Sequence, residues 1–168
     1  MTTEQKKYVT KFGSLDSYEK GSIEIIDDDP KHYTFSNIFE VAAAAKPWEK
    51  VAVGKNMEYV VEVIRAEGTS EWRTAPHDEF PLVMDGEVTI ELVKLDEPAV
   101  PSDKSGSVAL PGEPVGRPMG RIICRRGHLA LLPANTAYRM SAGRPSVVML
   151  QTVFGDDTIE RWAEICLS

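Results

Sequence analysis

His77 and Glu79 have the residue types and the spacing that could carry chemistry in this sequence. They are two positions apart in a stretch that alternates like a β-strand, so both side chains should point to the same face. An imidazole and a carboxylate on one face are suitable ligands for a transition metal. The alternative is that the two side chains hydrogen-bond within the protein or to a neighbouring subunit.

A metal site at this place needs more donors than one imidazole and one carboxylate. The sequence has 3 histidines, and the other two are His32, in the N-terminal region, and His128, at the start of a predicted strand. Neither is predicted to converge on His77. The two cysteines, Cys124 and Cys166, match no metal spacing, and we expect them to be buried free thiols. We therefore predict no bound metal in this chain.

The stretch 72–95 is predicted to position these residues, as two strands joined by a tight turn. Asp85-Gly86 tolerates the positive φ angles of a two-residue turn, which predicts a β-hairpin. On both sides of the turn apolar side chains alternate with other residues, which is the period of strands with one buried face. These apolar residues are Phe80, Leu82 and Met84 before the turn and Val88, Ile90 and Leu92 after it.

The rest of the chain predicts mostly short strands, which favours an all-β barrel or sandwich. One helix is expected to begin at Ser36 or Asn37 and to end before Pro47, and an amphipathic helix to begin at Asp156 and run to the C-terminus. The further predicted strands are residues 22–27, 33–36, 57–66, 121–125, 128–132, 136–141 and 147–154.

The length of 168 residues favours one domain, over residues 21–168, preceded by an N-terminal arm of residues 1–20. Residues 96–120 hold five prolines and little periodicity, which predicts a long loop. Such a loop is either a mobile insertion or a lid or binding arm.

Charge and hydropathy exclude two classes of partner. The net charge is −7, which disfavours nucleic acid and anionic membranes. No apolar run approaches the ~20 residues that span a bilayer. The start of the sequence lacks the hydrophobic core of a signal peptide, so we expect a cytoplasmic protein.

Two segments resemble the motifs of the cupin superfamily, whose members are double-stranded β-helix (jelly-roll) barrels. Glu79 and Gly86 match the second half of the first motif, with six residues between them. Gly127, Pro133 and Asn135 match the second motif, with asparagine in place of a glycine. Asparagine also adopts the left-handed backbone conformation, so this replacement is mild.

The departures from the cupin pattern concern its metal ligands. Counted back from Glu79, the two histidine positions of the first motif fall on Arg73 and Ala75; counted forward from Gly68, they fall on Thr74 and Pro76. The third histidine position, in the second motif, is Tyr138. The pocket that these motifs normally build therefore keeps only its carboxylate, and one carboxylate does not hold Fe(II).

Over most of its length the chain resembles the small (alpha) subunit of the two-component hydroquinone 1,2-dioxygenases. The resemblance lies in residues 32–96, 125–140 and 151–166. It implies an Fe(II)-dependent enzyme of aromatic and para-nitrophenol breakdown that opens hydroquinone to 4-hydroxymuconic semialdehyde. It also implies that a large partner subunit carries the iron, that this chain is non-catalytic, and that the two form a heterotetramer. Candidate anchors for the partner are Trp48, Trp72, Phe80 and the 96–120 loop.

Two other functions stay open at this stage. A free-standing metal enzyme of the same fold would use His77, Glu79 and Tyr138. A non-enzymatic cupin would hold a small molecule in the mouth of the barrel. In the assembled dioxygenase, Tyr138 could also contact the substrate, because its position normally faces the barrel interior.

Overall fold

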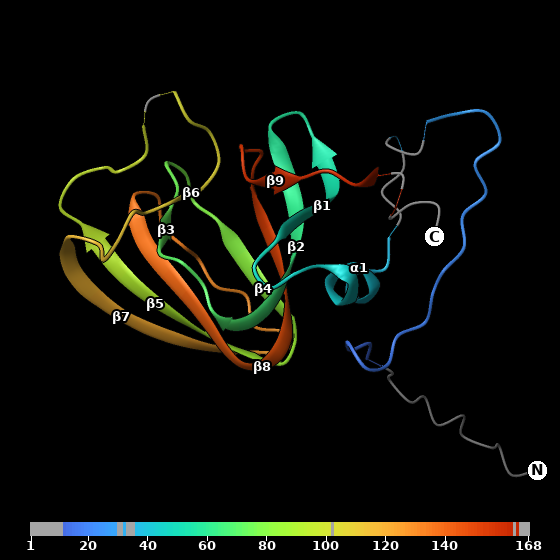
Figure 1. Cartoon of the computed structure of the whole chain (residues 1–168), viewed down its shortest axis with the longest axis horizontal. Coiled ribbons are helices and arrows are strands. Elements are labelled where there is room, and N and C mark those ends of the chain that lie inside the picture. The colour runs from blue at the N-terminus through green and yellow to red at the C-terminus, as the bar shows by residue number, and fades with distance from the viewer. Residues whose placement is uncertain (1–11, 30–31, 33–35, 102, 163, 165–168) are drawn as a thin grey trace, which may run out of the picture.

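The computed structural model describes residues 12–29, 32, 36–101, 103–162 and 164, and shows a strongly curled sheet with one helix at its side (Figure 1). In this part of the chain, no helix is long and apolar enough to cross a membrane. The elements in chain order are α1 (Ile38–Ala44), β1 (Lys50–Asn56), β2 (Tyr59–Thr69), β3 (Arg73–Thr74), β4 (Phe80–Asp85), β5 (Glu87–Leu95), β6 (Val108–Ala109), β7 (Gly116–Arg125), β8 (Thr136–Val153) and β9 (Thr158–Ile159).

Strand β8, 18 residues long, is the centre of the sheet. Strands β2 and β3 pair with one edge of β8, and β4 and β5 pair with the other. Strand β1 extends the sheet beyond β2, and β7 extends it beyond β5. The right-handed twist of a sheet built around so long a strand curls it into a barrel. The expected all-β barrel is thereby confirmed.

The predicted hairpin at Asp85-Gly86 is wrong. Strands β4 and β5 do not pair with each other; they pair one after the other with the same edge of β8. Gly86 has φ +82, but it bends the chain rather than reversing it. The Asp85 carboxylate fixes the bend, because it accepts hydrogen bonds from the backbone N–H of Gly86 at 2.9 Å and of Leu15 at 3.1 Å. For the same reason, the two strands predicted at 136–141 and 147–154 are one strand: β8 continues through Gly143 as a partner for both.

The burial of β4 also differs from the prediction. The buried set is Pro81, Val83 and Asp85, whereas Phe80 is exposed and Leu82 and Met84 are only partly buried. Met84 instead packs beneath α1, against the second apolar cluster. Both faces of β4 thus carry apolar side chains, and alternation alone did not identify the inner face.

Helix α1 begins as predicted. The Asn37 side chain accepts hydrogen bonds from the backbone N–H of Phe39 and Glu40, which satisfies two donors at the helix start. The C-terminal helix does not begin at Asp156, because Thr158–Ile159 instead form β9 in parallel pairing with β1. Trp162 and Glu164 are helical, and residues 163 and 165–168 lie outside the described part.

Three other predicted segments differ from the structure or lie largely outside the described residues. Residues 22–27 form no strand, and Ile26 is 90% exposed there. The strand expected at 33–36 lies almost wholly outside the described residues, as does most of the arm at 1–20. The loop predicted at 96–120 is shorter, because β7 begins at Gly116 and pairs with Leu95 in β5, while Val108–Ala109 pair with β3.

Two apolar clusters hold the barrel together. The first fills the barrel interior and includes Val83, Ile90, Leu132, Val148 and Leu150. The second lies between α1 and the sheet and is built mainly from valine and alanine. Cys124 belongs to the first cluster and is a buried free thiol, as predicted, while Cys166 lies outside the described residues.

Gly86 and Gly68 form a matched pair for testing the bend. Both have positive φ, but a Cβ at Gly86 would lie 2.0 Å from Ser146 Oγ, whereas one at Gly68 would meet nothing within 4 Å. We expect Gly68→Ala to cost about 1–2 kcal/mol of unfolding free energy from backbone strain alone. Gly86→Ala should cost about 1–3 kcal/mol more from overpacking. Urea unfolding measures both; equal losses would contradict the proposed bend.

Candidate functional site

Glu79 lies inside the barrel, where the cupin pattern places its one retained ligand. Its side chain is fully buried, and its Oε1 accepts a hydrogen bond from the Thr152 hydroxyl at 2.7 Å. Its other oxygen, Oε2, has no hydrogen-bond partner among the described residues. Glu79 directly precedes β4, and its backbone pairs with that of Leu132. The pairing of β4 with β8 then sets its position in the barrel. A buried carboxylate of this kind needs a source of positive charge nearby.

Arg73 supplies that charge from one of the positions where the cupin pattern has a histidine. Its guanidinium lies within the electrostatic reach of Glu79, and it also pairs with Asp157. It further donates to the Ser107 carbonyl at 3.0 Å. Burial lowers the pKa of Arg73. The hydrogen bond and the charge of Asp157, together with the charge of Glu79, outweigh burial and raise this pKa above its ordinary value. Arg73 is therefore a permanent cation.

Tyr138 stands directly across from Arg73 in the β3–β8 pairing. Its hydroxyl is buried and makes no direct hydrogen bond within the described part of the chain. Burial, followed by the negative charge of Glu79, raises the pKa of Tyr138 well above its usual value. The phenol is thus a neutral hydrogen-bond donor at neutral pH, and not a phenolate ligand for a metal. Asn135, three residues earlier, has φ 57, which confirms that it takes the left-handed conformation of the glycine in the motif.

His77 is near Glu79, but its ring is already engaged. Its Nε2 lies 2.9 Å from the Thr152 hydroxyl and 3.3 Å from the Val153 backbone nitrogen. Burial lowers the pKa of His77, and the neighbouring Lys50 lowers it further against the charge of Glu79. A neutral His77 therefore ties the end of β8 to the segment before β4. This is the structural alternative given for His77 from sequence.

The donor set at this place does not fit Fe(II). Glu79 offers one free oxygen, and His77 has its Nε2 in contact with Thr152 and Val153. The three remaining ligand positions hold the Arg73 guanidinium, the Ala75 methyl group and the Tyr138 phenol. Within the described ranges, no three His, Cys, Asp or Glu side chains come together as metal ligands do. Two imidazoles and a carboxylate are a common minimum for non-haem iron.

A second buried polar cluster escaped the sequence analysis. The Lys50 ammonium lies 3.1 Å from Glu62 Oε2 and donates to the Ser107 hydroxyl at 2.7 Å. The Thr158 hydroxyl donates to Glu62 Oε1 at 2.6 Å. These residues come from β1, β2, β9 and the segment before β6, and no local pattern connects them. Together with Arg73, they fasten the 105–107 segment and β9 to the barrel.

Next to this cluster the barrel mouth opens into a cavity of about 310 Å³. Its inner end is formed by the buried residues Lys50, Ile64, Tyr138, Met140 and Leu150, and its open end by more exposed residues. It is lined by Pro47, Trp48, Lys50, Ile64, Thr69, Ser70, Glu71, Arg73, Tyr138, Met140 and Leu150.

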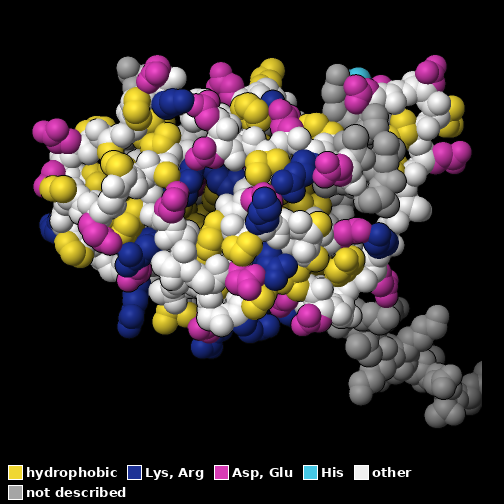
Figure 2. Space-filling view, viewed as in Figure 1, with side chains coloured by type: hydrophobic (Ala, Val, Ile, Leu, Met, Phe, Trp, Pro, Cys, Tyr) yellow, Lys and Arg dark blue, Asp and Glu magenta, His cyan; other side chains and the backbone are white. Residues whose placement is uncertain are grey.

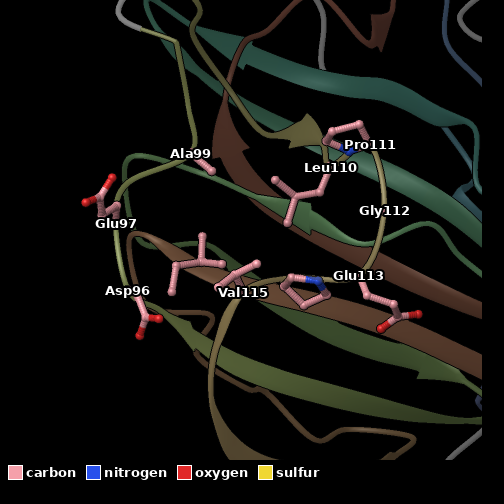
Figure 3. Close-up of a pocket in the computed structure, with 10 residues that line it drawn as sticks. Asp96, Glu97, Ala99, Leu110, Pro111, Gly112, Glu113 and Val115 are labelled. Atoms are coloured by element: carbon pink, nitrogen blue, oxygen red, sulfur yellow. The ribbon is translucent and has the colours of Figure 1, made fainter.

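A shallower hollow of about 560 Å³ lies between residues 95–99 and 110–115. Figure 3 shows Leu110 and Val115 facing it, while the carboxylates of Asp96, Glu97 and Glu113 point away. Glu113 accepts a hydrogen bond from the Trp72 indole at 3.0 Å. This hollow contains no group that could do chemistry. Elsewhere on the face in view, acidic, basic and hydrophobic side chains are interspersed (Figure 2).

Comparison with known proteins gives matches among solved structures. No protein-family model and no curated protein matches the chain. One solved structure is hydroquinone 1,2-dioxygenase PnpCD in complex with Cd²⁺ and 4-hydroxybenzonitrile. A chain of it is 52% identical to this chain, and the match covers 98% of this chain and 100% of that chain, with a TM-score of 0.89. The chain belongs to the hydroquinone 1,2-dioxygenase family. This confirms the resemblance inferred from the sequence.

A second member of the family agrees. A chain of hydroquinone 1,2-dioxygenase from Sphingomonas sp. TTNP3, with 4-hydroxybenzoate bound, is 52% identical over 95% of this chain and 98% of that chain, with a TM-score of 0.87. A different, longer chain matches in PnpCD with Fe³⁺, at 13% identity over 82% of this chain but 38% of that chain, with a TM-score of 0.60. At that identity the match shows the fold alone: a barrel like this one forms part of a longer chain.

The lowered pKa of His77 predicts a loss of stability in weak acid. The unfolded histidine takes up a proton near pH 6.5, whereas the folded one resists it. The stabilising effect is therefore complete above pH 6.5 and declines as the pH falls towards the folded pKa. Thermal unfolding between pH 7.5 and 5 should show a falling midpoint for the wild type and a flatter profile for His77→Gln. Identical profiles would mean that His77 does not titrate this way.

The Lys50–Glu62 pair should be costly to break on one side only. Lys50→Met leaves a fully buried carboxylate without its cation, and we expect a loss of about 3–5 kcal/mol in unfolding free energy. Lys50→Met combined with Glu62→Leu removes both charges and should recover much of this loss. Denaturant unfolding of the single and double variants checks the coupling; additive losses would contradict it.

Proposed function

We propose that this chain is the small, metal-free subunit of an Fe(II)-dependent hydroquinone 1,2-dioxygenase whose iron lies in a longer partner subunit. The observation that carries the proposal is the combination of 52% identity over the whole chain with a donor set unsuited to iron. The longer PnpCD chain, with a similar barrel, is the model for the partner. The iron, when bound there, supplies the oxygen activation for ring opening.

The substrate of the assembly would be hydroquinone, and the product 4-hydroxymuconic semialdehyde. A relative from Sphingomonas sp. TTNP3 has been solved with 4-nitrophenol, which supports a place in para-nitrophenol breakdown. The task of this chain would then be to hold the partner in its active form. Two copies of each subunit would make the heterotetramer.

The outer face of the barrel offers a surface for the partner. Phe80 is 39%, Leu131 44% and Leu129 63% exposed. Backbone pairing of Glu79 with Leu132 and of Leu82 with Leu129 sets these side chains next to one another on one face. Contiguous exposed leucine and phenylalanine are typical of protein interfaces. We propose that this apolar face, consisting of Phe80, Leu82, Leu129 and Leu131, contacts the large subunit.

Of the other anchors considered from sequence, Trp72 serves the barrel itself. It is 8% exposed, its indole binds Glu113, and the Arg139 guanidinium stacks on its ring at 4.5 Å. Trp48 lines the cavity at the barrel mouth. Of the tryptophans and Phe80, only Phe80 therefore belongs to the proposed contact face.

The test is reconstitution with the large subunit. The purified chain should give no turnover of hydroquinone, and oxygen uptake should appear when it is combined with the large subunit. The double variant Leu129→Glu/Leu131→Glu should keep the fold but lose complex formation in size-exclusion chromatography, because it places charge in the apolar contact face. Val115→Glu, at a 76% exposed position away from this face, is the matched control.

Two results would refute the proposal. One is full turnover of hydroquinone by the isolated chain. The other is full activity of the large subunit without it. Assembly of the Leu129→Glu/Leu131→Glu variant would refute the contact face alone.

A further inference from the structure

The cavity at the barrel mouth has the size and the walls of a small aromatic site. Its volume of about 310 Å³ is roughly twice that of the ~150 Å³ protein cavity known to bind benzene. Ile64, Met140 and Leu150 form its buried inner wall. Trp48 covers one side and packs against the same interior cluster. A planar ring can therefore replace water against apolar surface on several sides.

The polar groups at the inner end are hydrogen-bond donors. Tyr138 lines the cavity, and its buried hydroxyl lies near Glu79 and Ser107 but makes no hydrogen bond of normal length within the described residues. Lys50, 6% exposed, uses its ammonium on Glu62 and Ser107 and has a third N–H. A buried donor without a partner costs about 1–3 kcal/mol, which an oxygen acceptor in the cavity would offset. The site thus calls for a ring that carries an oxygen.

The charges around the cavity favour a neutral ligand. Lys50 and Arg73 are already paired with Glu62 and Asp157. Glu71 lies at the open end. An anionic ring would gain little from cations that are compensated and would be repelled by the acidic groups around them.

Backbone strain marks the same place. Trp48 has φ 65, which is costly for a residue with a large side chain, and its N–H is held by the Arg65 carbonyl at 2.9 Å. This conformation sets the indole at the cavity. Strain of this kind is concentrated at ligand sites.

We propose that the barrel-mouth cavity of this chain binds one neutral, single-ring phenol, whose oxygen accepts a hydrogen bond from Tyr138 and whose ring lies against Trp48, Met140 and Leu150. The site is built from residues of this chain alone. It needs no turnover, so it stands or falls independently of the proposed subunit role.

The experiment is calorimetric titration of the full chain with phenol, cyclohexanol and benzoate at pH 7. Phenol should bind saturably with one site per chain. Cyclohexanol tests whether a planar ring is required, and benzoate tests whether a neutral ligand is preferred. Both should bind at least about tenfold more weakly than phenol. Tyr138→Phe should weaken phenol about tenfold, the value of one hydrogen bond. Tyr59→Phe, at a 61% exposed tyrosine outside the cavity, should bind like the wild type.

Trp48→Gly provides an independent variant, because glycine accepts the positive φ while the indole is lost. It should remove detectable phenol binding. Because the indole also packs against the interior cluster, a lower unfolding midpoint is expected, and the titration is made at a temperature at which circular dichroism shows the variant folded. The proposal is overturned if phenol does not saturate the wild type, if benzoate binds more tightly than phenol, or if either folded variant binds phenol like the wild type.

Discussion

A fully buried carboxylate needs a cation within electrostatic reach, and this requirement organises the interior of the molecule. Glu79 is fully buried, with one oxygen bound to Thr152 and the other without a partner among the described residues. Arg73 brings a permanent positive charge to a position where the fold elsewhere carries an imidazole. A guanidinium is large and makes several directed hydrogen bonds, so it also binds Ser107 and Asp157. The Arg73 guanidinium thereby also fastens two distant segments to the barrel.

The polar interior is held in place by the long strand β8. It carries Tyr138 near one end and Thr152 near the other, 14 positions apart, and it pairs on both edges along most of its length. Strands β2 and β3 on one side bring Glu62 and Arg73 to it, and β4 on the other side follows Glu79. Because all these pairings share one strand, a shift of register would misplace every interior polar group at once. Gly86 and the Asp85 hydrogen bonds at the bend between β4 and β5 help to fix that register.

This interior explains how a family of enzymes can include a chain that lacks the usual metal ligands. The barrel keeps its architecture, because the packing of the apolar clusters does not depend on an ion. Its outer face and its mouth are then free to serve other purposes. Exposed leucines on the 128–132 segment suit contact with a partner, and the donor-lined cavity suits a small phenol. Such division of tasks between similar barrels agrees with the match of a longer PnpCD chain to the same fold.

The sequence by itself determined the all-β barrel, the Asn37 helix cap and the left-handed Asn135. Each of these depends on residue type and short spacing, which local sequence displays. The tertiary structure alone decided that β4 and β5 are not a hairpin. An Asp-Gly pair permits both a bend and a chain reversal, and the pairing of both strands with the same edge of β8 selects the bend. It alone assembled Lys50, Glu62, Ser107 and Thr158. These residues lie 12 to 96 positions from their partners, and no local periodicity of the sequence reports contacts between them.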